Sequence, residues 1–396
     1  MKILFVTPYI PYPPEADGTK LIIWNVAKQL AKKHELILVA FGEPSEVESS
    51  PLRDVFRQVH FVELQQSLTS RALSFGRSVA TKLPYSVEKF QKRQMVDVLS
   101  HVLLSTTVDV VHVETYALAH YVDIIHSTRC IASVHDSRSL TLAEEIRHAK
   151  KSPAMTGFLR RELALMQKYE ATVYSKFDAS VVVSEHDKNY LLSLNNATNI
   201  VVINNGVASA DGEWKPPSEQ LGIVFTGDLG YFPNEDAVIF FTREILPRVR
   251  ERIPDAQFFV VGRNPSKSIM DLAAHNVSVI VTGEVPSIRE YVERCAVSVA
   301  PIRYGSGVKN KILDALAVGR PVVALESACS GLARGFEEFV RRSTSAEAFA
   351  GHVIDILLTP SLVETIGRRA RDFVRTEHSW ERTAVAYERV YTGETS

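Results

Sequence analysis

The chain has 396 residues, of which 45% are hydrophobic and 23% charged, and its formal net charge is -1. This length exceeds a single ordinary core and predicts two domains of roughly 150–200 residues each, and the composition excludes a disordered or fibrous protein. Because the charges balance, no global field attracts the chain to nucleic acid, and we expect no nucleic-acid partner.

The first residues do not resemble a signal peptide. The apolar run at 2–7 is short, and prolines from Pro8 onward interrupt it. No run of about 18 apolar residues follows. The three cysteines, Cys130, Cys295 and Cys329, lie far apart in apolar stretches, as buried reduced thiols do. We therefore expect a cytoplasmic protein with at most a peripheral contact to a membrane.

The first half alternates short apolar runs with helical patterns. A strand is predicted at Lys2–Thr7, and after a proline-rich loop the apolar spacing predicts a helix from Leu21 to about Lys33. Six further runs are apolar on both faces, as buried parallel strands require: Leu36–Phe41, Val59–Glu63, Val108–Val113, Cys130–Val134, Ala179–Val183 and Ile200–Ile203. This alternation predicts an α/β fold with a doubly wound parallel sheet.

The second half repeats the alternation. Strands are predicted at Gly222–Thr226, Gln257–Val261, Val277–Thr282, Val297–Pro301 and Pro321–Leu325. Helices are predicted near Asp236–Arg250, Ile288–Arg294 and Asn310–Val318, and from about Thr359 to the end with a break near Ser379. Between the halves, residues 206–218 have the composition of an exposed linker. We therefore place an N-terminal domain at 1–208 and a C-terminal domain at 209–376.

Ligands of open parallel sheets bind beyond the carboxyl ends of the strands, and one such end here resembles a phosphate site. After the strand that ends at Pro301 come a glycine-containing loop and a helix with lysines in its first turn: Gly305, Ser306, Gly307, Val308, Lys309 and Lys311. Glycines let backbone N–H groups approach phosphate, and a lysine in a first turn opposes the helix dipole unless an anion offsets it. The pattern predicts a diphosphate site. The alternative is a surface turn with solvated lysines.

Other residues of the second half could complete this site. Asp314, five residues after Lys309, could accept ribose hydroxyl protons or be an ordinary acid of an amphipathic helix. Glycines and their neighbours also follow two other strands, where backbone groups could bind a nucleobase edge and an arginine could meet phosphate. These residues are Gly262, Arg263, Gly283, Glu284 and Val285. The alternative for both ends is a plain tight turn.

Two positions of the first half are further candidates. Gly18 opens the first helix and would offer free N–H groups to a phosphate or sugar, although small-residue caps are common. His135 follows a predicted strand, with Asp136 beside it. It could anchor a sugar hydroxyl or be a structural loop histidine.

Several motifs are absent from the sequence. There is no Asp-x-Asp pair, no G-x-S-x-G elbow, no P-loop and no Cys/His cluster with metal spacing. We therefore expect no metal and no cofactor, and cations with helix dipoles would have to stabilise a departing diphosphate.

A cationic, amphipathic stretch lies between Ser70 and Met95. It has one acid, Glu88, and six basic residues interleaved with apolar and aromatic ones: Arg71, Arg77, Lys82, Lys89, Lys92 and Arg93. It could touch anionic lipid or a lipid-diphosphate acceptor. Alternatively, it is a solvated helical face with its aromatics in the core.

With these residues in view, the chain resembles retaining GT-B glycosyltransferases of family 4 over essentially its full length. The most specific matching segment is Ser306–Val323, SGVKNKILDALAVGRPVV. The shorter ones are Met1–Pro8 with Gly18, His135 with Asp136, Val201–Val207, Val224–Gly227, Val261–Arg263 and Val281–Val285.

This resemblance implies two facing Rossmann-like domains with a cleft between them, the donor held by the C-terminal one and the acceptor by the N-terminal one. The last helix, about 377–396, would pack back on the first domain. It implies metal-independent sugar transfer from a nucleotide-diphosphate sugar with retention of configuration. Gly18 would lie near the diphosphate, His135 near the donor sugar, and Asp314 on the ribose.

The chain departs from the family pattern at two places. Two glutamates eight residues apart are replaced by Ser306 and Asp314. The Arg and Lys that often follow the first strand of the C-terminal domain are also missing, and Gly227 and Asn234 stand in that region and are expected to line the donor. We infer that Lys309 supplies the missing positive charge.

We expect a front-face displacement in which the leaving phosphate oxygen deprotonates the acceptor. The partners would be the nucleotide sugar and a carbohydrate, lipid-linked or small-molecule acceptor, in polysaccharide or glycoconjugate synthesis. The alternatives are a nucleotide-sugar 2-epimerase on the same fold, or a non-catalytic protein that binds sugar nucleotides. A nicotinamide enzyme would need a glycine fingerprint where Pro8–Pro14 stands.

Overall fold

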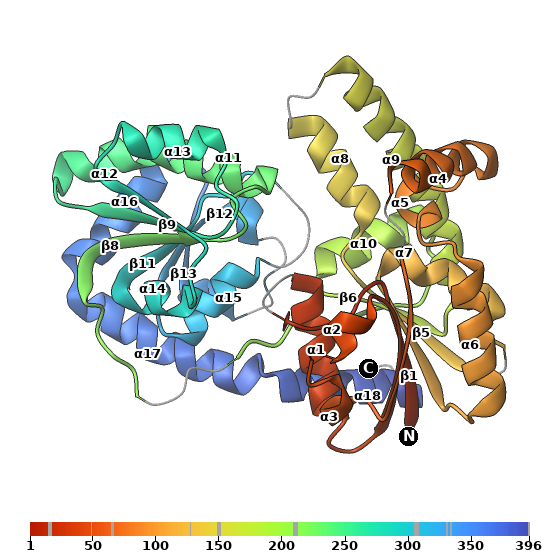
Figure 1. The fold of residues 1–396 in the computed structure, drawn as a ribbon. Helices are drawn as coiled ribbons and strands as arrows, with labels where there is room; N and C mark the ends of the chain where they lie inside the picture. The colour runs from red at the N-terminus through yellow and green to blue at the C-terminus, as the bar shows by residue number, and fades with distance from the viewer. Residues whose placement is uncertain are drawn as a thin grey trace. The chain divides into compact units, whose positions relative to one another are not determined.

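The computed structural model describes residues 1–14, 18–48, 50–64, 67–126, 128–148, 152–208, 213–304, 309–329, 332 and 335–394. The chain divides into two compact units (Figure 1). The first unit comprises Met1–Gly206 and Trp380–Ser396, and the second Val207–Ser379. The division falls close to the expected boundary after residue 208, and the last helix belongs to the first unit.

The first unit is built on a seven-stranded sheet in the order β3-β2-β1-β4-β5-β6-β7 (Figure 1). All its neighbouring strands are parallel. The order starts in the middle and winds outward in both directions, as in doubly wound folds. The strands are β1 (Lys2–Thr7), β2 (Glu35–Phe41), β3 (Gln58–Val62), β4 (Val110–Glu114), β5 (Arg129–His135), β6 (Ala179–Val182) and β7 (Ile200–Val202).

Helices cover both faces of this first sheet, because its strands are apolar on both sides. One face packs against α1 (Gly18–Leu30), α3 (Leu52–Val55) and α18 (Trp380–Thr392). The opposite face packs against α5 (Tyr85–Glu88), α6 (Arg93–Ser105), α7 (Thr115–Leu118), η2 (Ala119–Ile124), α9 (Pro153–Val173), η3 (Tyr174–Lys176) and α10 (Glu185–Leu194). The remaining helices are α2 (Pro44–Glu48), α4 (Leu68–Thr81) and α8 (Arg138–His148).

The second unit has a six-stranded parallel sheet in the order β10-β9-β8-β11-β12-β13. Its strands are β8 (Glu219–Thr226), β9 (Gln257–Val261), β10 (Val279–Gly283), β11 (Cys295–Ala300), β12 (Val322–Leu325) and β13 (Val340–Ser343). Its helices are α11 (Phe232–Phe240), a π-turn η4 (Phe241–Ile245), α12 (Leu246–Arg252), α13 (Lys267–Ala274), α14 (Ile288–Arg294), α15 (Asn310–Ala317), η5 (Glu326–Cys329), η6 (Phe336–Glu338), α16 (Ala346–Leu358) and α17 (Pro360–Glu377). The two units therefore repeat one winding pattern.

The structure confirms the predicted strands and changes three details. The helix predicted from Asp236 begins earlier, at Phe232, and contains the π-turn. Strand β13 was not predicted, because it lies at the sheet edge and its sequence is VRRS. The predicted linker is held at its described ends: the Trp214 Nε1 donates to the Gly319 carbonyl at 3.0 Å, and Gly206 packs against Trp380.

The long helices near the C-terminus end where the sequence predicts a break. Helix α17 ends at Glu377 and α18 begins at Trp380. In the described part of the chain no single helix has the length and apolar character of a membrane span; only the bent pair Ala346–Leu358 and Pro360–Thr392 meets these criteria, with its two arms combined.

Candidate functional site

The carboxyl edges of both sheets carry residues with a positive φ. In the second unit these are the glycines that close β8, β9 and β10: Gly227 (φ 152), Gly262 (φ 154) and Gly283 (φ 68). In the first unit they are Thr115 (φ 66), after β4, and His135 (φ 70), the last residue of β5. L-residues with side chains rarely adopt this region, and such residues gather at functional sites. The backbone therefore points to these two edges.

In the second unit, two of the glycines allow the strand ends to touch. A Cβ on Gly262 would lie 1.7 Å from the carbonyl oxygen of Gly227, so no side chain fits there. The Gly227 N–H donates to Val261 at 3.0 Å, and the Gly262 N–H to Gly283 at 3.2 Å. These hydrogen bonds join three strand ends into one rim, in which Gly262 is buried and Gly227 and Gly283 are half-buried.

Lys311 reaches this rim from the first turn of α15. Its Nζ donates to Asn234 Oδ1 at 2.8 Å and lies 3.8 Å from the centre of the Phe225 ring. A Cβ on Gly227 would lie 3.1 Å from the same Nζ. Lys311 is half-buried as a whole, but its ammonium end points inward against these groups. The structure thus places the Lys311 ammonium against Gly227, where Asn234 and Lys311 occupy the space that a side chain would need.

The charges around Lys311 are unbalanced toward the positive. Burial and the nearby charge of Lys309 lower the pKa of Lys311 well below its usual value, whereas Asp314 raises it. Helix α15 has no acid in its first turn. An anion beside Lys311 would favour its charged form and relieve the repulsion between the two lysines. This corner of the unit is suited to binding a negatively charged group.

The predicted donor residues of the second unit have different surroundings. Lys309 is the half-buried N-cap residue of α15, and Asp314 is exposed on the same helix. Ser306, Gly307 and Val308 lie outside the described residues. The structure therefore describes the helix that follows the predicted phosphate loop, and Lys311 is the lysine whose ammonium it places at the rim.

Asn234 and Arg263 are both engaged in contacts at the rim. Asn234, buried in α11, donates from Nδ2 to the Asp228 carbonyl at 2.9 Å and accepts from Lys311. The Arg263 Nε donates to Asp228 Oδ2 at 2.9 Å. Burial would raise the pKa of Asp228, but the hydrogen bonds from Arg263 and Gly230 lower it overall. Asn234 therefore orients the lysine, and Arg263 fixes the loop after β8.

The end of β10 is the open part of the rim. A Cβ on Gly283 would have no neighbour within 4 Å. Glu284 is exposed, and Val285 is half-buried against the core. The Gly283 carbonyl accepts from the Gly262 N–H and from the Thr282 hydroxyl, so what this segment offers is the open space beside the glycine.

In the first unit, His135 belongs to a buried chain of polar side chains. His135 Nε2 lies 2.7 Å from Glu114 Oε2, and His112 Nε2 lies 2.9 Å from Glu114 Oε1. Both Glu114 and His112 come from β4, two residues apart on one face of the strand. Burial alone would raise the pKa of Glu114, but the charges and hydrogen bonds of His112 and His135 lower it to about 2. The carboxylate is therefore held ionised between two imidazoles.

This series of buried polar contacts continues to α18, the last helix of the protein. His112 Nδ1 is hydrogen-bonded to the Tyr391 hydroxyl, and Tyr387 bonds to Ser133 at 2.8 Å. Both tyrosines are buried residues of α18. His112 also stacks on Phe5, with ring centres 4.4 Å apart. These contacts fix the orientation of Glu114 and, through it, of the His135 ring.

A second buried acid holds the loop after His135. Glu170 on α9 accepts hydrogen bonds from the Ser137 hydroxyl at 3.0 Å, from the Arg138 N–H at 2.9 Å, and from the Ser139 hydroxyl. Burial raises the pKa of Glu170 to about 7, although these hydrogen bonds lower it. The start of α8 is thus attached to α9 directly behind His135.

Gly18 is the exposed first residue of α1. The first turn of α1 contains no acid, and Lys20 Nζ donates to the Tyr12 carbonyl at 3.3 Å. Asp17, which precedes it, lies outside the described residues. The structure thus begins α1 at Gly18, and the role of this helix end in binding stays a prediction.

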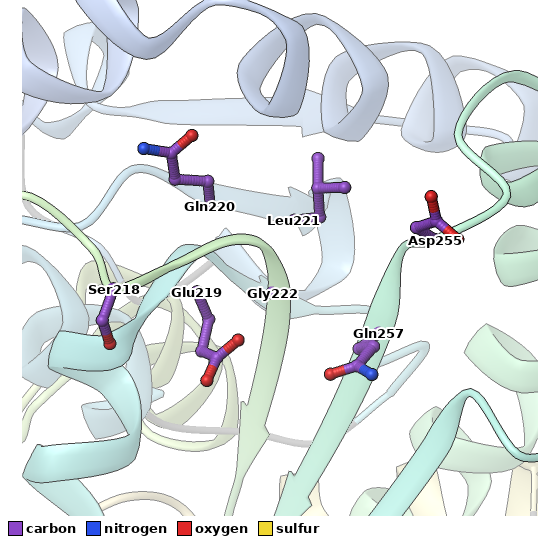
Figure 2. A pocket seen from close by; sticks show the side chains of 7 residues that line it. All are labelled: Ser218, Glu219, Gln220, Leu221, Gly222, Asp255 and Gln257. Atoms are coloured by element: carbon purple, nitrogen blue, oxygen red, sulfur yellow. The ribbon is translucent and has the colours of Figure 1, made fainter.

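A surface pocket lies elsewhere, at the opposite edge of the second sheet. Figure 2 shows its lining around the beginnings of β8 and β9. The lining residues are Ser218, Glu219, Gln220, Leu221, Gly222, Asp255 and Gln257. Ligands of parallel sheets bind at the carboxyl edge, and these lining residues include two acids and no base. This pocket does not suit an anionic ligand.

Sequence reasoning named Lys311 beside Lys309 in the predicted phosphate segment but assigned the charge to Lys309, and it missed Glu114 and His112 behind His135. The signal for the last two was present, because an acid and a histidine two residues apart interrupt an otherwise apolar strand. Among the described residues, no cluster of three or more His, Cys, Asp or Glu side chains could hold a metal ion.

Comparison with known families agrees with both halves of the chain. Residues 16–210 match the profile of Glycosyltransferase Family 4, and residues 220–359 match Glycosyl transferases group 1. Together the two matches account for most of the sequence. A comparison with curated protein sequences gives no significant match.

Solved structures share the whole fold at low sequence identity. Sucrose-phosphate synthase from Thermosynechococcus elongatus superimposes with a TM-score of 0.72 at 16% identity, covering 99% of each chain. HepE of Anabaena, in complex with UDP and glucose, gives a TM-score of 0.70 at 14% identity, covering 99% of this chain and 100% of that one. A glycosyltransferase from Rickettsia africae gives a TM-score of 0.64 at 14% identity, covering 99% of this chain and 98% of that one. The fold is GT-B, and the chain belongs to the group 1, family 4 glycosyltransferases.

Proposed function

We propose that this glycosyltransferase takes its sugar from a nucleotide-diphosphate donor held at the rim of the second unit. The observation that carries the proposal is the Lys311 ammonium, which Asn234 holds beside Gly227 at the carboxyl edge of the second sheet. A diphosphate there would meet one fixed cation, the charge of Lys309 and the N-terminus of α15. The UDP and UDP-glucose complexes of HepE, a protein of the same fold, support this ligand class.

The remaining donor contacts follow from the shape of the rim. The base would lie against the open backbone around Gly283, Glu284 and Val285, where a Cβ on the glycine would have no neighbour. Asp314, exposed on α15, would accept hydrogen bonds from the ribose hydroxyls. Ser306, Gly307 and Val308 would contribute backbone N–H groups to the phosphates, as their sequence predicts.

The proposed reaction is a front-face displacement with retention of configuration. The bond between the anomeric carbon and the β-phosphate oxygen breaks, and the acceptor oxygen bonds to the same face of that carbon. The acceptor proton passes to the leaving phosphate oxygen. Lys311, Lys309 and backbone N–H groups, with the Gly18 end of α1, would stabilise the charge that develops on the diphosphate.

His135 would act on the sugar side of the reaction. Its strained backbone and its bond to Glu114 hold the ring in one orientation, which suits a hydrogen bond to a donor sugar hydroxyl or to the sugar as it develops positive charge. The buried Glu114 carboxylate would stabilise positive charge on the ring. Glu114 and His112 are therefore positioning residues.

We further propose that transfer needs no metal and serves polysaccharide or glycoconjugate synthesis in the cytoplasm. The support for the first point is that the sequence lacks an Asp-x-Asp pair, while lysines lie where a metal would otherwise neutralise the diphosphate. Activity that persists in excess EDTA would agree with this mechanism, and a strict metal requirement would contradict it.

The experiment that tests the donor site is a thermal-shift screen of UDP-, GDP-, ADP- and dTDP-sugars, with Lys311→Met as the site variant. One nucleotide class should raise the melting temperature of the wild-type chain and leave the variant unshifted. No shift with any nucleotide would refute the proposal. NMR of the product then reports the anomeric configuration, and donor conversion without acceptor would instead indicate the 2-epimerase.

A further inference from the structure

Helix α4 of the first unit buries polar residues and exposes its apolar ones. Its buried residues are Ser74 and Ser78, whereas its large apolar residues are exposed. Leu68 is 83% exposed, Leu73 65%, Phe75 44% and Val79 54%. A helix of a soluble protein normally turns its apolar stripe to the core. These four residues therefore form an apolar surface that the described chain does not cover.

The exposed residues follow the helical period. Leu68, Ala72, Phe75 and Val79 are separated by four, three and four residues, so they form one stripe along the helix. The neighbouring outward positions, Gly76 and Ala80, are small and uncharged. Phe75 lies 6.2 Å from Phe158 of α9, and Met155 near the start of α9 is also exposed. The apolar surface thus extends from α4 to α9.

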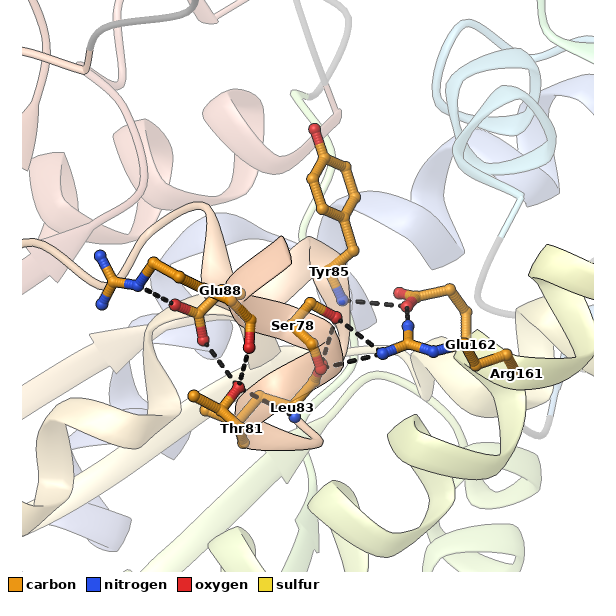
Figure 3. Close-up of polar contacts among 8 residues, drawn as sticks. Ser78, Thr81, Leu83, Tyr85, Glu88, Arg161 and Glu162 are labelled. Atoms are coloured by element: carbon orange, nitrogen blue, oxygen red, sulfur yellow. Dashed lines mark hydrogen bonds and ion pairs between the residues drawn. The ribbon is translucent and has the colours of Figure 1, made fainter. Parts of the chain in front are cut away.

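A polar network on the inner side fixes this orientation (Figure 3). The Ser78 hydroxyl donates to the Leu83 carbonyl at 2.6 Å, and Arg161 Nη2 donates to the Ser78 carbonyl at 2.9 Å. Arg161 is paired with Glu162 at 3.1 Å, and Glu162 also accepts from the Tyr85 N–H at 3.0 Å. Because the helix buries the hydrogen-bonded Ser78, rotating it to hide its apolar stripe would break these bonds.

The charges beside the stripe are positive. Helix α4 contains no acid, and the exposed Arg71 lies beside the stripe. The exposed Lys82 caps the helix at its C-terminal end. Arg77 lies on the opposite face, where it pairs at 2.9 Å with the buried Glu88, so this pair adds no net charge to the surface. An apolar stripe between basic side chains complements a surface of anionic headgroups over hydrocarbon.

We propose that α4 binds the surface of an anionic lipid bilayer, with Leu68, Phe75 and Val79 in the headgroup boundary and Arg71 and Lys82 on the lipid phosphates. A symmetric contact between two copies of the chain would bring the arginines of one copy to those of the other, which the charges oppose. The inference does not depend on the sugar-transfer reaction, because lipid binding is measured without donor or acceptor.

Co-sedimentation tests the proposal with two kinds of vesicle: phosphatidylcholine alone, and phosphatidylcholine with about 30 mol% phosphatidylglycerol. The full chain should bind the anionic vesicles, bind the neutral ones weakly, and lose affinity as salt increases. The double variant Leu68→Glu, Val79→Glu should bind about tenfold or more weakly. Leu104→Glu is the matched control, because Leu104 is 89% exposed on α6 of the same unit.

The charge contribution has its own pair of variants. Arg71→Glu with Lys82→Glu should weaken binding by roughly fivefold or more for each charge, whereas Arg57→Glu, an exposed arginine before β3, should not. Unchanged circular dichroism and melting temperature would show that each variant is folded. A fluorophore on Ala72→Cys should report an apolar environment on anionic vesicles, since the three native cysteines are buried.

Three results would overturn the proposal. The first is a wild-type chain that does not sediment with anionic vesicles at low salt. The second is equal loss of binding in the α4 variants and in their controls. The third is light scattering that shows a dimer which Val79→Glu dissociates, because the stripe would then be a contact between copies.

Discussion

The carboxyl edges of the two sheets both contain residues with a positive φ, but these residues have different roles at the two edges. In the second unit three of the positive-φ residues are glycines that close β8, β9 and β10, and the absence of side chains lets these strand ends meet, while Asn264 (φ 56) lies in the loop after β9. In the first unit they are Thr115 and His135, whose side chains make the same backbone region strained. One edge provides space, and the other provides a side chain in a fixed orientation.

The polar groups of the two edges differ in the same way. Lys311 is held by one neutral amide and is repelled by another lysine, so its position favours the arrival of an anion. His135 is bound to a carboxylate that a second histidine also contacts, so its polar partner is supplied inside the protein. The comparison indicates that the second unit is suited to binding an anion, whereas the first unit holds the His135 side chain in one orientation.

Among the variants that test this difference between the two units, Lys311→Met has the largest expected effect. Loss of the ammonium beside Gly227 should lower kcat/KM by about 10³-fold, equivalent to about 4 kcal/mol, because a fixed donor to a developing anion contributes on this scale. Steady-state kinetics with the donor found by thermal shift would measure it. Lys309→Ala should have a smaller effect, and Lys267→Met, exposed at the start of α13, should have none. A rate near that of the wild-type enzyme would remove Lys311 from the site.

Two glycines of the rim test whether the strand ends are in contact at Gly262 and whether the space beside Gly283 is open. Gly262→Ala should lower the free energy of unfolding of the second unit by about 3 kcal/mol, because its Cβ would collide with the Gly227 carbonyl. Gly283→Ala meets no neighbour and should cost only about 1 kcal/mol of backbone strain. Urea unfolding followed by tryptophan fluorescence compares them. Equal losses would mean that the strand ends do not meet as described.

Glu114→Gln tests the orienting role of the first unit. A neutral amide between the two histidines should lower kcat by roughly 30-fold, about 2 kcal/mol, with little change in the KM of the donor. Because the pKa of Glu114 is lowered to about 2, the carboxylate contributes stability above about pH 4.5 that is lost as pH falls toward 2. The variant should therefore lose part of the acid-unfolding transition. Glu251→Gln, an exposed acid of α12, serves as the control.

The last test concerns Glu170, behind the His135 loop, and its effect is on stability alone. Its pKa is raised to about 7 by burial, so the protonated form is favoured in the folded state. Its contribution is full below about pH 4.5 and is lost as pH rises through 7, at no more than about 1.4 kcal/mol per pH unit. Melting temperatures of the wild-type chain and of Glu170→Gln should diverge over this range, the variant being less sensitive to pH. Parallel curves would show that Glu170 is ionised throughout.

Most of the fold follows from local patterns. Buried parallel strands need long apolar side chains on both faces, so β1 and β9 could be read from the sequence with their bounds. The edge strand β13 could not, because only Val340 and Ser343 of its residues are buried and its arginines are not typical of a strand. The π-turn in the middle of the helix after Phe232 has no sequence signal either.

The candidate site was predicted in part, for a similar reason. Glycines at strand ends can be recognised one at a time in a sequence. The sequence analysis named three of them as candidates: Gly227, Gly262 and Gly283. The choice between Lys309 and Lys311 depends on which side chain turns toward β8, and that depends on Phe225 and Asn234, about eighty residues away in sequence. The partners of His135 likewise include Tyr391 through His112, a contact across 279 positions.

Helix α18 also affects the order in which the chain can assemble as the ribosome makes it. All of the second unit, up to Ser379, is synthesised before Tyr387 and Tyr391 exist. Until the last helix emerges, the part of the first sheet that α18 covers stays exposed beside α1 and α3, and His112 lacks its phenol partner. The half of the protein that is translated first is the half that is completed last.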